Sequence, residues 1–151
     1  MQAGDAPNRV LYFARNRIMR GAPDGWRAKD DMPELPSILI VEDEYLLQGV
    51  LEDVLTQYGF AADILSSGEE ALTVFLARGR HHKALVTDVS LSGNLNGWDV
   101  ARRIREKEPD LPVVYMTGAG VDLWKSQGVP NSVLLEKPFQ PERLVETLLQ
   151  M

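Results

Sequence analysis

The sequence contains no cysteine, which excludes disulfide bonds, thiolate nucleophiles and thiolate metal ligands. It also has no apolar run long enough to cross a bilayer, and its N-terminus lacks the uninterrupted apolar core of a signal peptide. Positive charge is scarce too, with 16 Lys and Arg against 22 Asp and Glu and a net charge of −6. A cytoplasmic protein without membrane insertion is expected.

The negative charge is concentrated in one part of the chain. From Ser37 onward there are 10 basic and 17 acidic residues, giving −7, whereas residues 1–36 have 6 and 5, giving +1. An acidic body argues against binding nucleic acid. With 151 residues and 44% hydrophobic content, the chain is long enough for one core, so one domain at 37–151 and an extension at 1–36 are expected.

Residues 1–36 are rich in Gly, Pro and Asp toward their end, which is typical of a flexible extension. Two alternatives remain open for this segment. It could contain a short basic amphipathic helix that binds a partner or membrane surface, or translation could begin at Met19 or Met32. The residues of the amphipathic pattern are Arg9, Val10, Leu11, Phe13, Arg15, Arg17, Ile18, Met19 and Arg20.

Strand-like and helix-like patterns alternate five times after this extension. Apolar runs predict strands at 37–41, 60–65, 84–88, 113–117 and 133–137, and three- to four-residue apolar spacing predicts helices at 44–58, 67–79, 98–107, 121–127 and from 141. The helix at 67–79 is expected to bury Ala71, Leu72, Phe75 and Leu76. Such alternation predicts a doubly wound parallel α/β sheet with helices on both faces.

Chemically useful side chains stand where the predicted strands end. Glu42 and Asp43 follow the first strand, Asp88 ends the third and Thr117 ends the fourth. The last strand runs through Glu136 to Lys137-Pro138. Because the carboxyl ends of parallel strands meet at one edge, these groups are expected to gather there.

In this order of acidic pair, single Asp, Thr and Lys-Pro, residues 37–151 resemble the receiver domain of two-component response regulators. The resemblance implies a flavodoxin-like five-stranded sheet of order 2-1-3-4-5. It also implies a phosphoryl group transferred to Asp88 from a sensor histidine kinase or a histidine phosphotransfer protein, and a signal passed to an unknown protein target. No output domain follows Met151, so a single-domain regulator is expected, and not an enzyme beyond its own phosphorylation and dephosphorylation.

Three neighbouring carboxylates repel one another, and a divalent cation would relieve that repulsion. Oxygen ligands favour Mg²⁺ or Mn²⁺ over zinc. We assign Asp43 and Asp88 as direct ligands and Glu42 as a ligand through water, and the resemblance adds the backbone carbonyl of Ser90. Asp88 would be the nucleophile.

Two further groups would stabilise the transferred phosphoryl oxygens. Lys137 supplies a positive charge and Thr117 a hydroxyl donor, while Gly118 leaves access to the threonine.

The sequence departs from the resembled pattern at three places. The loop after Asp88 is one residue longer before Gly97, Ser92 stands where proline is common, and Leu134 replaces a frequent aromatic residue. A leucine cannot repeat the aromatic rotation that accompanies activation in the resembled family. The loop at 118–120 and the short helix after it are therefore the expected moving parts.

Three other functions fit the sequence less well. A receiver-fold adaptor that acts without phosphorylation stays the alternative, although the complete set of site residues disfavours it. A hydrolase of the haloacid dehalogenase type would need a second acid where Ser90 stands, and a dinucleotide-binding fold would need a glycine-rich turn where Glu42-Asp43-Glu44 stands. His81 and His82 are expected to be surface loop residues, and the aromatics Tyr45, Tyr58, Trp98 and Trp124 to be packing residues.

Overall fold

A computed structural model describes residues 35–78 and 81–151. The expectations for an extension, an amphipathic helix or alternative starts lie almost entirely outside the described residues. In the described part, no helix has both the length and the apolar character that a membrane span requires.

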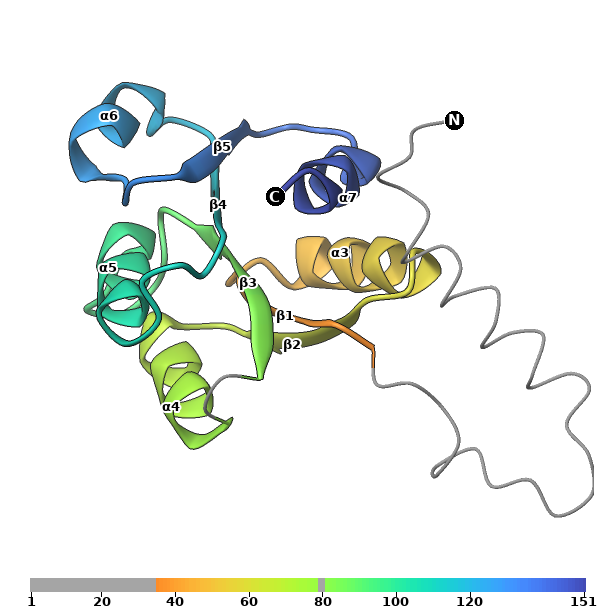
Figure 1. Cartoon of the computed structure of the whole chain (residues 1–151). Coiled ribbons are helices and arrows are strands. Elements are labelled where there is room, and N and C mark those ends of the chain that lie inside the picture. The colour runs from red at the N-terminus through yellow and green to blue at the C-terminus, as the bar shows by residue number, and fades with distance from the viewer. Residues whose placement is uncertain (1–34, 79–80) are drawn as a thin grey trace, which may run out of the picture.

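Five parallel strands form one sheet of order β2-β1-β3-β4-β5, as expected (Figure 1). The strands are β1 (Ser37–Val41), β2 (Ala61–Leu65), β3 (His82–Asp88), β4 (Val113–Thr117) and β5 (Ser132–Glu136). The helices are α3 (Tyr45–Gln57), α4 (Gly68–Arg78), α5 (Gly97–Lys107), α6 (Trp124–Gln127) and α7 (Pro141–Leu149), with a 3₁₀ turn, η2 (Val121–Leu123), before α6.

The sheet separates two apolar layers, because alternate strand residues point to opposite faces. Leu39 and Val41 pack with α4 and α5, whereas Ile38 and Ile40 pack with α3 and α7. Figure 1 shows these helix pairs on opposite sides of the strands. β1 and β4 are buried throughout, which explains their continuous apolar sequences.

Local signals set the helix ends. Gly59, at φ +86°, ends α3 in the left-handed conformation that glycine adopts at little cost. Ser67 Oγ accepts a hydrogen bond from the Glu70 amide at the start of α4. Asn96 and Asp99 form a reciprocal capping box on α5. At Gly97, a Cβ would overlap the Asp88 carbonyl oxygen, so only glycine lets α5 begin so close to the end of β3.

Three expectations were wrong. His82 is buried and begins β3, where its ring stacks on Phe75 and bonds to Asp63, so it is not a surface loop residue. Leu76 is 61% exposed, because the inward positions of α4 are taken by Ala71 and Phe75. Tyr45 is 84% exposed at the first position of α3 and is not a packing residue.

Candidate metal and carboxylate site

The predicted site residues meet at the carboxyl edge of the sheet. Asp88 and Thr117 are the last residues of β3 and β4, and Glu42 directly follows β1. Lys137 directly follows β5, where its amide donates to the Thr117 carbonyl at 2.8 Å. Parallel pairing of β1, β3, β4 and β5 thus brings residues up to 95 positions apart in the sequence into one place.

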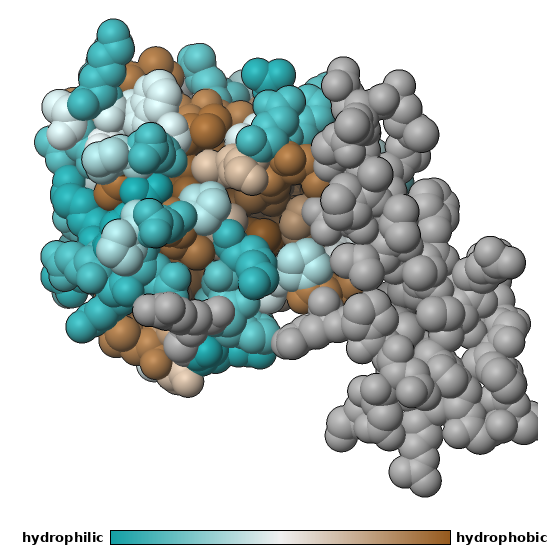
Figure 2. Space-filling model, in the orientation of Figure 1, coloured by the Kyte–Doolittle hydropathy of each residue, from teal (hydrophilic) through white to brown (hydrophobic). Residues whose placement is uncertain are grey.

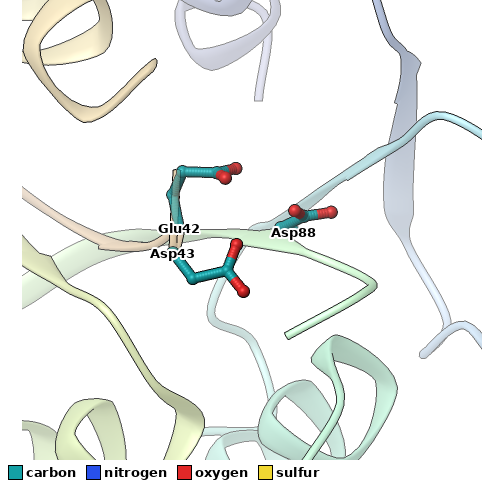
Figure 3. A group of neighbouring side chains, drawn as sticks. All are labelled: Glu42, Asp43 and Asp88. Carbon is teal, nitrogen blue, oxygen red and sulfur yellow. The ribbon is translucent and has the colours of Figure 1, made fainter. Parts of the chain in front are cut away.

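Three carboxylates converge at this edge (Figure 3). Glu42, Asp43 and Asp88 each offer an oxygen, and these oxygens all lie within 4.8 Å of one another. Glu42 is fully buried and Asp88 nearly so, whereas Asp43 is exposed. The cluster is open to solvent on the side of Asp43, so a cation or a phosphoryl group would reach it from that side.

Lys137 is the cation that the structure places within this cluster. Its Nζ donates to Glu42 Oε2 and to Asp88 Oδ2, both at 3.1 Å. Burial alone would lower the pKa of Lys137, but the hydrogen bonds to Glu42 and Asp88 raise it on balance, so the ammonium stays charged. One ammonium faces three carboxylates, which leaves an excess of negative charge.

Glu42 is the least solvated of the three acids. Burial raises its pKa, and the nearby Asp88 raises it further, while hydrogen bonds from the Glu44 amide and from Lys137 act in the opposite direction. A carboxylate in such a place favours a compensating cation.

Thr117 presents its hydroxyl to the segment that follows β4. Its Oγ1 accepts hydrogen bonds from the amides of Ala119, at 3.2 Å, and Gly120, at 2.6 Å. A Cβ at Gly120 would lie 2.7 Å from that oxygen, so only glycine permits so close an approach. The hydroxyl therefore organises the turn that leads into η2.

Ser90 and Ser92 both contact the acids from the loop after β3. The Ser90 amide donates to Asp88 Oδ1 at 3.3 Å, and the role of its carbonyl as a ligand stays a prediction. The Ser92 amide and hydroxyl both donate to Asp43 Oδ2, at 3.0 and 2.8 Å. The sequence reasoning noticed Ser92 only as a departure from a pattern and missed this contact, since nothing local in the sequence pairs positions 43 and 92.

An apolar groove of about 420 Å³ adjoins the site between α3 and the loop before α7. Lys137 and Glu44 lie at this groove, together with Leu46, Leu47, Val50, Pro138 and Phe139. Leu46 is 78% exposed and Val50 is half-exposed, so exposed apolar side chains lie in the same groove as Glu44 and Lys137. The space-filling view shows apolar surface on the side of the molecule that carries α3 and α7 (Figure 2).

The donor set fits a hard divalent cation. All three side chains offer carboxylate oxygens, which suit Mg²⁺ or Mn²⁺, and the cluster has more negative charge than Lys137 can balance. Such an ion needs several carboxylate oxygens close together and one side open to solvent, and this cluster offers both.

The chain is similar to several known proteins. A family model described as the response regulator receiver domain matches residues 38–149. The crystal structure of a response regulator receiver protein from Sinorhizobium medicae is 38% identical, with a TM-score of 0.72, and covers 78% of this chain and 96% of that one. The receiver domain of a sensor histidine kinase from Pseudomonas aeruginosa is 25% identical, with a TM-score of 0.66 and coverage of 78% and 97%, and its structure has a magnesium ion coordinated in the active site cleft.

Curated relatives are longer proteins. The probable transcriptional regulators ycf27 of Cyanophora paradoxa and Pyropia yezoensis are 33% and 35% identical over 109 residues. Those residues are 71% of this chain but only 44% and 43% of the relatives. The match thus covers less than half the length of each of these two regulators.

Proposed function

Because the chain belongs to the family of response regulator receiver domains, we propose that it accepts a phosphoryl group on Asp88 in a Mg²⁺-dependent reaction and signals through protein contacts. The proposed donor is a sensor histidine kinase or a histidine phosphotransfer protein, and the proposed compartment is the cytoplasm. The observation that carries this proposal is the position of Asp88, the last residue of a buried strand, with Glu42, Asp43 and Lys137 around its carboxylate.

The proposed chemistry is a transfer between two nucleophiles. An Asp88 carboxylate oxygen attacks the phosphorus of a phosphohistidine, the P–N bond breaks, and the electron pair stays with the imidazole nitrogen. Lys137 already contacts Asp88 Oδ2 at 3.1 Å, so its charge lies where negative oxygens of the phosphoryl group would arrive. The product is a mixed anhydride of Asp88, which hydrolysis returns to the free acid.

The proposed metal ligands are Asp43 and Asp88 directly, Glu42 through water and the Ser90 carbonyl. When bound, Mg²⁺ would offset the charge of the acids and of the incoming phosphoryl oxygens. The chain itself supplies the rest: buried Glu42 lines the inner side of the site, and Lys137 bonds two of the acids from the side of β5.

The apolar groove supports a protein as the phosphoryl donor. Leu46, Val50 and Phe139 offer apolar area beside Lys137, which a protein donor would cover. Exposed apolar side chains next to a reactive group are typical of a protein contact.

We propose that the signal leaves the site through Thr117. Its hydroxyl oxygen accepts hydrogen bonds from the amides of Ala119 and Gly120. If the hydroxyl rotates toward a phosphoryl oxygen on Asp88, these two bonds would break or the segment that carries the amides would move with it. Gly120 in turn adjoins Trp98, since a Cβ there would lie 3.6 Å from the indole. Leu134, which lies in β5, offers no ring to rotate, so the segment 118–128 is the proposed moving part.

Hydrogen exchange with and without beryllofluoride, a phosphoryl mimic, tests this route. Protection is expected to change most at residues 118–128, and the fluorescence of Trp124, which donates to Ser132, is expected to shift. Changes confined to residues 89–97 would instead place the output on α5.

The curated relatives are transcriptional regulators, but the matched part is less than half of each. We therefore propose a protein as the immediate target of the receiver domain rather than a nucleic acid. The excess of acidic residues in the body also favours this choice.

The phosphoacceptor role is tested by intact-mass measurement after incubation with Mg²⁺ and acetyl phosphate. One added phosphoryl unit is expected on the wild-type chain, and none on Asp88→Ala or in the presence of a chelator. Equal labelling of Asp88→Ala, or labelling without any divalent ion, would refute the assignment.

A further inference from the structure

Asp43 is the one exposed acid among the three proposed metal ligands, and Ser92 holds it. The Ser92 amide and hydroxyl both donate to the same oxygen, Oδ2, at 3.0 and 2.8 Å. An exposed aspartate in the segment between β1 and α3 would otherwise sample several rotamers. Two donors on one oxygen leave the other oxygen, Oδ1, for a cation. Figure 3 shows one Asp43 oxygen turned toward Glu42 and Asp88 and the other turned away.

The loop that carries Ser92 is itself fixed from α4. Glu69 Oε1 accepts hydrogen bonds from the amides of Asn94 and Leu95, at 3.0 and 3.1 Å. Between them and Ser92 lies Gly93, whose φ of +99° lets the chain turn sharply toward Glu69. The hydrogen bond from its own backbone amide, together with those from the amides of Asn94 and Leu95, holds the pKa of Glu69 below its usual value, so the carboxylate that holds the loop stays ionised near neutral pH.

The other end of the same loop is fixed as well. Asn96 and Asp99 close the capping box, and α5 then begins against the Asp88 carbonyl. Ser92 therefore stands on a short segment held at Glu69 and at α5. Its two donors are in place before any ion arrives.

We propose that Ser92 is a positioning residue for the metal ligand Asp43, and that Glu69 acts on metal affinity by fixing the loop that carries Ser92. This inference rests on the proposed function, because it concerns the affinity of that metal site. A ligand already held in its binding rotamer loses less conformational entropy when the ion binds. The link depends on the Ser92 hydroxyl and amide proton.

The first test measures Mn²⁺ affinity directly, from the electron paramagnetic resonance signal of the free ion at fixed ionic strength. Ser92→Ala is expected to bind Mn²⁺ roughly tenfold more weakly, at the lower end of the usual loss when a partner behind a metal ligand is removed. Ser92→Thr, which keeps the hydroxyl, is expected to restore the affinity. Asn94→Ala is the matched control, since Asn94 bonds Glu69 through its backbone amide and not its side chain.

The second test asks whether Glu69 acts through Ser92. Glu69→Ala removes the acceptor and the charge, whereas Glu69→Gln removes the charge and keeps an oxygen that can accept from the two amides. Glu69→Ala is expected to weaken Mn²⁺ binding more than Glu69→Gln does. Its effect is expected to shrink in the Ser92→Ala background, because residues that act through one contact are not additive.

Each outcome decides one part of the proposal. Ser92→Ala binding as tightly as wild type, or more tightly, overturns the role of Ser92, and so does a failure of Ser92→Thr to restore the affinity. Equal effects of the two Glu69 variants, or full additivity with Ser92→Ala, overturn the role of Glu69. If the wild type itself binds no Mn²⁺, the proposed metal site fails instead, so the two failures are distinguishable.

Discussion

The two ends of the sheet both hold charged side chains, but they balance them differently. At the carboxyl end, one cation, Lys137, bonds Glu42 and Asp88, and Asp43 lies in the same cluster of acids. Toward the amino end, Asp63 is shared by Arg78, which donates to both of its oxygens, and by His82, whose Nε2 lies 2.8 Å from Oδ2. The group at the carboxyl end has a surplus of negative charge. In the group toward the amino end, the single acid Asp63 already has Arg78 and His82 as partners.

This difference distinguishes a functional site from a structural contact. A paired carboxylate needs nothing further, so the Asp63 group has the features of a structural contact that joins β2, the end of α4 and the start of β3. Surplus carboxylates repel one another until a cation or a proton arrives, so they cost stability in the folded protein. Residues that cost stability where they stand are expected to serve binding or chemistry.

The largest expected effect on stability is therefore at the amino end. Asp63→Ala would leave His82 buried without its partner, and the Nδ1 of that ring already has no partner among the described residues. A buried polar group left unsatisfied costs about 1–3 kcal/mol, so a loss of about 2 kcal/mol is expected in urea unfolding.

Asp43→Asn provides the contrast at the carboxyl end. It is expected to keep or slightly raise the stability of the metal-free protein, since it removes one of the repelling charges. If Asp43→Asn lost as much stability as Asp63→Ala, the distinction between the two ends would be wrong.

Magnesium is expected to act at the carboxyl end alone. An ion that binds only the folded state with a Kd near ~1 mM adds roughly 1.4 kcal/mol at about 10 mM. Thermal melts of the wild type and of Asp63→Asn should both show this gain, whereas Asp43→Asn should lose most of it. An equal response of Asp43→Asn would place the bound ion elsewhere.

A smaller effect is expected from acidification at the amino end. Burial lowers the pKa of His82 below its ordinary 6.5, against the opposing influence of Asp63, while His81 and Arg78 lower it further. The unfolded chain therefore takes up the proton at higher pH than the folded protein. The stability that neutral His82 contributes is present above about pH 6.5 and is lost as the pH falls through the lower pKa of the folded state.

His82→Gln tests this contribution, because glutamine can donate to Asp63 but does not titrate. The loss of unfolding free energy between about pH 7.5 and pH 5.5 is expected to be smaller for the variant than for the wild type. His81→Gln is the control at the neighbouring position. A wild-type pH dependence in His82→Gln would show that other groups cause it.

The sequence predicted the fold because its signals were local and repeated. Four apolar strands each end at a carboxylate, hydroxyl or ammonium side chain, and a parallel sheet places these ends together. Glu42, Asp88, Thr117 and Lys137 could therefore be named in advance. Helix boundaries agreed within a few residues, since glycine, proline and capping side chains mark them locally.

The errors came from contacts between distant positions. His81-His82-Lys83 is a polar run, so the strand was expected to begin at Ala84, but Asp63 makes it favourable to bury His82. Ser92 and Glu69 are ordinary surface residues in the sequence. Their contacts with Asp43 and with the loop at 93–95 follow only from how β1, α4 and that loop meet in space.

The most direct test of the site assignment is chemical trapping of the phosphorylated residue. Borohydride reduces an aspartyl phosphate to the corresponding alcohol, and peptide mapping then locates it in wild-type protein treated with acetyl phosphate and Mg²⁺. Reduction is expected at position 88 and at no other acid. Reduction at Glu42, Asp43 or Asp63, with position 88 unchanged, would contradict the account.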